Sequence, residues 1–166
     1  MGQEINIRKM VAADLDSVTS IYNEVFNPTY ISFGELAVGR AVTPNTPSPN
    51  ATEIFRNQIA EKLQTLHSGL FVAISMDSIV GFAVARLLAT PAGHLECWVD
   101  DLGVSLSCRR QGIGEQLVSF VLKWGIDRKA KYFLLESGKK NEIAHRLFER
   151  LGFKPASIVF YKGNRL

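Results

Sequence analysis

A turn that contains two arginines and two glycines, Arg109–Gly114, most constrains how this chain can fold. It lies between an apolar run that ends near Leu106 and a run of apolar residues at helical spacing. Its glycines let the backbone approach a ligand closely, and the first N–H groups of the following helix have no partner within that helix. The strand–turn–helix unit predicts an anion site for a phosphate or pyrophosphate, to which the arginines add positive charge. A tight turn without a ligand is the alternative.

Strand and helix patterns alternate on both sides of this turn. Apolar runs rich in β-branched and aromatic residues predict strands, and apolar residues three or four positions apart predict helices. The predicted strands span residues 5–9, 70–75, 79–88, 96–106, 132–136 and 157–161, and the predicted helices span 13–25, 52–68, 112–129 and 141–151. This order predicts an α/β fold in which a mixed central β-sheet is flanked by helices, within a single domain over residues 1–166.

One segment, residues 28–52, follows neither pattern. It contains the run Thr-Pro-Asn-Thr-Pro-Ser-Pro-Asn, and three prolines in eight residues exclude a helix or a central strand. We therefore expect a long loop. Loops of this length are usually functional, so the segment is a candidate insertion on the substrate side of the site.

Composition and charge exclude several classes of function. The 19 basic and 16 acidic side chains are interspersed, so we expect no nucleic-acid partner. No window approaches the roughly 20 apolar residues of a membrane span, and the first residues lack the apolar core of a signal peptide. These features predict a cytoplasmic protein without a membrane partner. Cys97 and Cys108 lack metal-binding spacing, so we expect buried apolar cysteines and no metal.

Two common phosphate-binding turns do not fit Arg109–Gly114. A P-loop requires Lys and then Ser or Thr after its last glycine, whereas Glu115 follows Gly114. A dinucleotide-binding turn requires a third glycine, and Leu117 stands at that position. The remaining pattern, Arg-x-x-Gly-x-Gly, resembles the acetyl-CoA signature of the GCN5-related N-acetyltransferase (GNAT) family. Residues 100–118 as a whole look like that family's central strand, turn and helix.

A second motif in the expected order strengthens the resemblance. Residues 141–153 are similar to the family's second signature, whose recurring residues are here Asn141, Ala144, Leu147, Phe148 and the pair Gly152–Phe153. The resemblance implies an acetyl-CoA-dependent N-acetyltransferase. Such an enzyme transfers an acetyl group to a primary amine of a small molecule or peptide by direct attack of the amine.

The resemblance also implies which residues hold acetyl-CoA. In this family the pantetheine arm lies between two diverging strands, and the turn holds the pyrophosphate. A strand amide would also polarise the thioester carbonyl. The expected contacts come from one strand, the turn and the last helix: Leu102, Gly103, Val104, Arg109, Arg110, Gln111, Gly112, Ile113, Gly114, Asn141 and Phe148.

The amine must lose a proton before or during its attack, and a carboxylate can accept that proton. The candidate bases are Glu96, Asp100, Asp101 and Glu136. Strict alternation along the strand would place Asp100 on one face with Glu96 and Leu102, and Asp101 on the opposite face.

The chain departs from the family at Phe148, where many members have a tyrosine that protonates the leaving thiolate. Phenylalanine has no proton to donate. A thiol has a pKa near 8.5 and is already a fair leaving group, so turnover need not be lost. Tyr161, Tyr132 or water could supply the proton instead.

Two other interpretations stay open at this point. The chain could be a catalytically degenerate member that binds acyl-CoA as a sensor or interaction module, which the missing tyrosine favours. A nucleotide-binding protein that uses the glycine turn for ATP is a third reading, but the sequence lacks the Lys-Ser/Thr pair. Because family members often pair through their late strands, a homodimer is also consistent with the resemblance.

Overall fold

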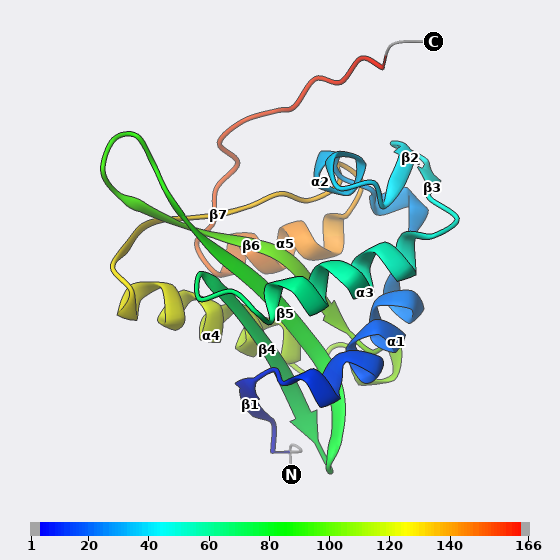
Figure 1. Ribbon diagram of the computed structural model, residues 1–166, viewed down its shortest axis with the longest axis vertical. Helices are drawn as coiled ribbons and strands as arrows, with labels where there is room; N and C mark the ends of the chain where they lie inside the picture. The colour runs from blue at the N-terminus through cyan, green and yellow to red at the C-terminus, as the bar shows by residue number, and fades with distance from the viewer. Residues whose placement is uncertain (1–3, 164–166) are drawn as a thin grey trace.

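Five strands form the main sheet of the computed structural model, which describes residues 4–163 (Figure 1). The strands are β1 (Asn6–Lys9), β4 (Ser68–Ser75), β5 (Ser78–Ala89), β6 (Leu95–Val104) and β7 (Ala130–Leu135). They lie in the order β1-β4-β5-β6-β7, and all neighbours are antiparallel except β6 and β7, which are parallel. The predicted α/β fold with a mixed central sheet is confirmed.

Helices cover both faces of this sheet (Figure 1). The long helices are α1 (Leu15–Val25), α3 (Ala51–Lys62), α4 (Ile113–Asp127) and α5 (Glu142–Arg150). Three short 3-10 turns accompany them: η1 (Ala12–Asp14), η2 (Pro28–Tyr30) and η3 (Leu106–Cys108). Helices α1 and α3 pack on one face, and α4 packs on the other. Helix α5 lies beside α4, where Arg150 is 3.8 Å from Glu115.

Each face of the sheet has its own apolar core. The core under α1 and α3 contains Val18, Phe55 and Phe82, and the core under α4 contains Leu117 and Cys97. Each fully buried side chain of this size stabilises the fold by about 1.5–3 kcal/mol relative to exposure. Cys97 is buried as predicted, and burial raises the pKa of its thiol to about 11.

Residues 28–52 are not the continuous loop that the sequence predicted. They contain η2, the helix α2 (Phe33–Ala37) and a small hairpin of β2 (Ala41–Thr43) and β3 (Thr46–Pro47). Pro47 is tolerated because β3 belongs to a separate two-stranded sheet and not to the central one. The segment is therefore built from short elements, which apolar periodicity does not reveal.

Two other element boundaries differ from the prediction. Helix α3 ends at Lys62 instead of continuing to residue 68, and Leu66 is 94% exposed. The Thr65 N–H and the Thr65 hydroxyl both lie close to the Lys62 carbonyl oxygen, at 3.1 and 3.0 Å, and this contact closes the last turn. Residues 157–161 do not close the sheet. They run extended and exposed, without a strand partner.

A β-bulge in β6 places two acids on the same face of the sheet. Residues 84–85 of β5 face residues 99–101 of β6, so β6 carries one extra residue. Asp100 and Asp101 both bind cations on the α3 side, whereas Leu102 packs in the core under α4. The alternation that grouped Asp100 with Leu102 was therefore wrong. In the described part of the chain, no helix is long and apolar enough to cross a membrane.

Candidate active site

A cavity of about 170 Å³ lies where β6 and β7 separate. The two strands pair only as far as Val99 and Leu135, whereas β6 continues to Val104 in its pairing with β5. The edge of residues 100–104 that faces β7 therefore has no strand partner. Backbone N–H and C=O groups on this edge are available to a ligand, except the Val104 carbonyl oxygen, which accepts a hydrogen bond from Arg109 Nε at 3.4 Å.

Segments from six parts of the chain line this cavity. They are α1, residues 26–35, β5, β6, the end of β7 with the residues that follow it, and α5 with its cap residue. The polar side chains in the lining are Tyr22, Asn27, Tyr30, Ser32, Glu35, Asp100, Asp101, Glu136, Ser137 and Asn141. A second cavity of about 90 Å³ shares Ser32, Glu35, Asp100 and Glu136 with the first, and Arg40 and Arg86 also line it.

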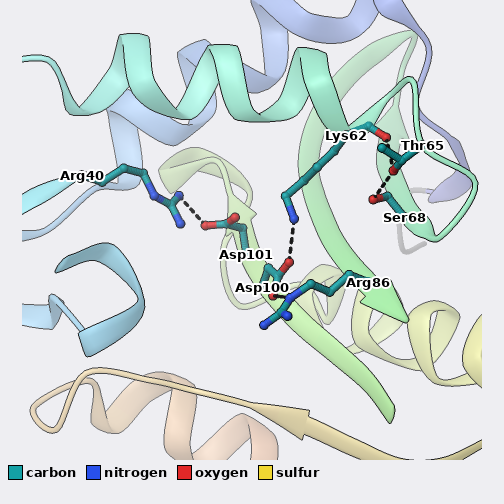
Figure 2. Close-up of polar contacts among 7 residues, drawn as sticks. All are labelled: Arg40, Lys62, Thr65, Ser68, Arg86, Asp100 and Asp101. Carbon is teal, nitrogen blue, oxygen red and sulfur yellow. Dashed lines mark hydrogen bonds and ion pairs between the residues drawn. The ribbon is translucent and has the colours of Figure 1, made fainter. Parts of the chain in front are cut away.

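Arg40 and Asp101 form a buried ion pair beside the cavity (Figure 2). Arg40 Nη1 lies 2.6 Å from Asp101 Oδ1, and the two side chains are only 7% and 14% exposed. The Arg40 guanidinium also lies 5.6 Å from the ring centroids of Tyr22 and Phe55, which stack on each other at 3.9 Å. Arg40 is thus held by one carboxylate and two aromatic rings.

Burial raises the pKa of Asp101 to about 6, although the neighbouring Arg40 acts in the opposite direction. Burial likewise raises the pKa of Tyr22 to about 12, so this phenol stays protonated. Asp101 is therefore a carboxylate that exchanges its proton near neutral pH. Its second oxygen, Oδ2, has no hydrogen-bond partner within residues 4–163.

Asp100 is held by two cations (Figure 2). Lys62 Nζ, at the end of α3, donates to Oδ2 at 2.8 Å, and Arg86 Nε of β5 donates to Oδ1 at 2.9 Å. Arg86 also lies over the ring of Trp98 at 5.4 Å. Because each of its carboxylate oxygens accepts a bond from a cation, Asp100 connects α3, β5 and β6.

Two other acids in the lining have no cation within 4 Å among the described residues. Glu136 Oε1 accepts a hydrogen bond from the Gly34 N–H at 2.9 Å, and Glu35 accepts bonds from the Ser32 N–H and the Ser32 hydroxyl. No ion pair with Glu35 or Glu136 occurs in this part of the chain. Both carboxylates therefore leave negative charge at the cavity.

The remaining two catalytic candidates lie away from this cavity. Glu96 accepts a hydrogen bond from Trp98 Nε1 at 2.9 Å and lines neither cavity. Tyr161 belongs to the extended tail, is half exposed and also lines neither cavity. Three of the four candidate bases, Asp100, Asp101 and Glu136, are thus brought together, and the candidate acid is not.

The turn before α4 has the geometry expected of an anion site. Gly112 has φ of 77° and caps the helix, and a Cβ there would meet only Gln116 Nε2, at 4.0 Å. The helix has 15 residues and its first N–H groups lack intrahelical acceptors. Arg109 and Arg110 are both exposed beside the turn. The backbone here therefore fits a pyrophosphate, and a side chain at position 112 would be strained.

Helix α5 and its cap residue, Asn141, form a further side of the cavity. The Asn141 side chain accepts a hydrogen bond from the Ala144 N–H at 3.4 Å, so it caps the helix as well as lining the cavity. Phe148 is 9% exposed and lines the cavity, with its ring 6.1 Å from that of Phe153. Phe148 therefore contributes an apolar wall.

Sequence reasoning missed several residues of the site. Arg40 and Glu35 lie in the segment that had no pattern, and nothing in the sequence links them to a strand about 60 residues later. The Ser137 hydroxyl is buried without a hydrogen-bond partner in the described part of the chain. Gly138, which follows the predicted strand 132–136, is the one sequence feature that indicates close packing here. A Cβ at this position would overlap the Tyr30 carbonyl group and push this wall of the cavity apart. Residues 4–163 contain no group of three or more His, Cys, Asp or Glu side chains able to hold a metal ion.

Known proteins share this sequence pattern and this fold. Residues 36–153 match the model of the acetyltransferase (GNAT) family. An aminoglycoside N(6')-acetyltransferase type 1 of Salmonella typhimurium strain LT2 is 24% identical over 107 residues, which are 61% of this chain and 74% of that protein.

Solved structures agree with this assignment of the fold. AAC(6')-Iy, in complex with the bisubstrate analogue CoA-S-monomethyl-acetylneamine, has a TM-score of 0.72 at 18% identity and covers 98% of this chain and 99% of its own. AAC(6')-IG from Acinetobacter haemolyticus has a TM-score of 0.72 at 14% identity, covering 97% and 99%. A protein described as a transcriptional regulator from Bacillus halodurans C-125 has a TM-score of 0.71 at 19% identity, covering 97% and 100%.

The match of the family model covers more than half of the chain and includes both the glycine turn and the helix that carries Asn141 and Phe148. Strands β6 and β7 stop pairing beyond Val99 and Leu135, and Gly112 caps helix α4. The chain therefore belongs to the acetyltransferase (GNAT) family and, as a member, is an acetyl-CoA-dependent N-acetyltransferase.

Proposed function

We propose that this protein acetylates a primary amine of a small molecule that carries more than one positive charge. The observation that carries the proposal is the set of acids at the cavity between β6 and β7, two of which have no cation within 4 Å in the described residues. Such a site attracts cationic amines. The relatives named as aminoglycoside acetyltransferases support this class of acceptor, because aminoglycosides carry several amines.

The coenzyme would be held mainly by main-chain groups. Residues 102–104 have no strand partner on the edge that faces β7, which suits the amides of a pantetheine arm; there the Val104 carbonyl oxygen accepts a hydrogen bond from Arg109 Nε at 3.4 Å. Residues 111–114 and the first turn of α4 would bind the pyrophosphate, with Arg109 and Arg110 adding charge at the same end. Asn141 and Phe148 would border the arm from α5.

Asp101 is the proposed base. Its pKa of about 6 lets it accept a proton from the acceptor ammonium, directly or through water, near neutral pH. Arg40 holds one carboxylate oxygen, which leaves Oδ2 for the proton. The neutral amine then forms the new N–C bond, the C–S bond breaks, and the proton that the nitrogen loses passes through water to the leaving thiolate. An N–H of the β6 edge stabilises the carbonyl oxygen.

No side chain is assigned as the acid that protonates the leaving thiolate. Phe148 has no proton to donate, and Tyr161 lies outside the cavity. Because a thiolate with a pKa near 8.5 leaves without a protein acid, water can complete the reaction.

Glu136 and Glu35 are proposed to bind a second ammonium group of the acceptor. Glu136 has one oxygen, Oε2, with no hydrogen bond to the described residues. A charge-assisted hydrogen bond of this kind contributes about 1.5–3 kcal/mol. An acceptor with two amines should therefore bind at least about tenfold more tightly than a monoamine of similar size.

The test is release of the CoA thiol from acetyl-CoA in the presence of matched monoamines, diamines and aminoglycosides. We expect Glu136→Gln to raise KM for acceptors with two amines by about tenfold or more and to leave KM for acetyl-CoA unchanged. Glu142→Gln, at an exposed position outside the cavity lining, is the control. Thiol release that depends on no amine, or equal KM values in the two variants, would contradict the proposal. Acetyl-CoA binding without release on a broad panel would favour the sensor interpretation.

A further inference from the structure

Two buried hydroxyl groups in the lining of the cavity between β6 and β7 have no hydrogen-bond partner among the described residues. They belong to Tyr22 of α1 and to Ser137, which follows β7. Nearly all buried polar groups of folded proteins are paired, because an unpaired one loses its bonds to water without replacement. We therefore expect each hydroxyl to gain a partner when a ligand fills the cavity.

Ser137 lies where the two strands separate. Leu135, two residues earlier, is the last residue of β7 that pairs with β6, opposite Val99. The pantetheine arm is proposed to run from the pyrophosphate turn along residues 104–102, and so toward this last pair. Its thioester is at the end farthest from the pyrophosphate. Ser137 therefore borders the cavity at the end where the thioester lies, on the β7 side.

The neighbours of Ser137 fix its backbone on both sides. Glu136 Oε1 accepts a hydrogen bond from the Gly34 N–H at 2.9 Å. Gly138 is buried against the Tyr30 carbonyl group, so closely that a Cβ at this position would overlap it. The hydroxyl is thus positioned before any ligand binds, which is the property of a preorganised hydrogen-bond donor.

The Tyr22 hydroxyl belongs to the other side of the cavity. Its ring stacks on Phe55 at 3.9 Å and lies 5.6 Å from the Arg40 guanidinium, which binds the proposed base, Asp101. Tyr22 is therefore grouped with the residues that receive the amine. Ser137 is the unpartnered hydroxyl on the side of the coenzyme strands.

We propose that the Ser137 hydroxyl donates a hydrogen bond to the sulfur of acetyl-CoA and stabilises the negative charge that forms there as the C–S bond breaks. The proton that neutralises the thiolate still arrives through water, so Ser137 gains and loses no atom. Hydrogen bonds to charged groups are stronger than those to neutral ones, so this contact strengthens in the transition state and accelerates the reaction. Phe148 cannot make such a contact.

This inference rests on the proposed placement of the coenzyme between β6 and β7, but not on which amine is acetylated. The first test therefore uses CoA without an acceptor. The thiol of bound CoA is titrated by the ultraviolet absorbance of its thiolate, and the same protein with desulfo-CoA supplies the background from its own cysteines and tyrosines. In the parent, we expect the pKa of the bound thiol to lie below its ordinary value of about 8.5.

In Ser137→Ala, the pKa of the bound thiol should be about one pH unit higher than in the parent, because the thiolate loses a donor. Ser119→Ala is the matched control, since Ser119 is exposed on α4 and lines neither cavity. It should give the pKa of the parent. Equal pKa values in the parent and in Ser137→Ala would overturn the proposal.

The second test is turnover with an acceptor that the parent acetylates. Ser137→Ala should lower kcat by about tenfold or more and leave KM for acetyl-CoA unchanged, because the uncharged thioester sulfur is a weak acceptor. Its unfolding free energy without ligand should equal or exceed that of the parent, since the hydroxyl has no partner to lose.

Two results of this second test would overturn the proposal. One is a kcat for Ser137→Ala within about twofold of the parent value; the other is a loss of kcat that comes with a loss of unfolding free energy, which would show a structural role. A parent that binds CoA with the lowered thiol pKa but acetylates no amine would instead contradict the proposed function and support the contact with the sulfur.

Discussion

Replacing Arg40 by Met should destabilise the fold, because it leaves the Asp101 carboxylate buried without its cation. Arg40 Nη1 lies 2.6 Å from Asp101 Oδ1, and the side chains are nearly inaccessible to water. Methionine preserves much of the apolar stem beside Tyr22 and Phe55, so the substitution removes charge more than volume. The change in unfolding free energy on Arg40→Met therefore measures the contribution of the ion pair.

The expected loss of unfolding free energy is about 3–5 kcal/mol at about pH 8.5, since removing one partner of a buried ion pair leaves the other charge uncompensated. The pair Arg56 and Asp16 provides a control at the surface, where the side chains are 42% and 85% exposed. Arg56→Met should cost less than about 1 kcal/mol, because exposed pairs contribute little.

The loss of unfolding free energy caused by Arg40→Met should decrease as the pH falls. In the parent protein burial already raises the pKa of Asp101 to about 6, and Arg40 acts against that rise. Without Arg40 the pKa should rise by roughly 1–3 further units. The folded variant then binds the Asp101 proton more tightly than the unfolded chain does, so lower pH stabilises the folded variant. The difference between variant and parent should decrease by up to about 1.4 kcal/mol per pH unit from the raised pKa down to about 6.

The assay is urea unfolding of parent, Arg40→Met and Arg56→Met, followed by tryptophan fluorescence of Trp98 and Trp124 at about pH 6.5, 7.5 and 8.5. A deficit for Arg40→Met that stays below about 1 kcal/mol, or that does not change with pH, would refute the reasoning. Either result would mean that Asp101 does not retain a buried charge.

Three further predictions concern the site. Asp101→Asn should lower kcat/KM by about 10²–10⁴ and remove the acid limb of the pH–rate profile near pH 6, whereas Asp16→Asn should leave both unchanged. Gly112→Ala should raise KM for acetyl-CoA by about tenfold, because φ of 77° strains a side chain at the pyrophosphate turn. The control is Gly93→Ala, between β5 and β6, where φ of 78° causes similar strain; it should leave KM for acetyl-CoA unchanged. Phe148→Tyr should change kcat by less than about threefold, and an increase of about 100-fold would show that thiolate protonation limits the reaction.

Local signals in the sequence predicted the parts of the fold and site that depend on neighbouring residues. The turn Arg109–Gly114 was predicted with its role because a strand end, two glycines and a helix start are adjacent in the chain. The strands predicted over residues 70–75 and 79–88 were recognised for the same reason, and the structure joins them through Met76 and Asp77, which have the positive φ of a two-residue turn.

Long-range features were not predictable in this way. Arg40 and Asp101 are 61 positions apart, and no periodicity connects them. The bulge at Asp100 changes the face of every later residue in β6, yet an alternating strand sequence gives no sign of one extra residue. The run 157–161 has a strand sequence, but a strand forms only where an edge is available to pair with it.

The central claim, acetyl transfer from acetyl-CoA to a small polycationic amine, is tested most directly by measuring CoA thiol release and acceptor acetylation in the same reaction. The account predicts one acetylated amine for each thiol released, with a higher kcat/KM for acceptors that carry two or more amines than for matched monoamines. Thiol release without an acetylated acceptor, or no preference for the polycationic acceptors, would contradict it.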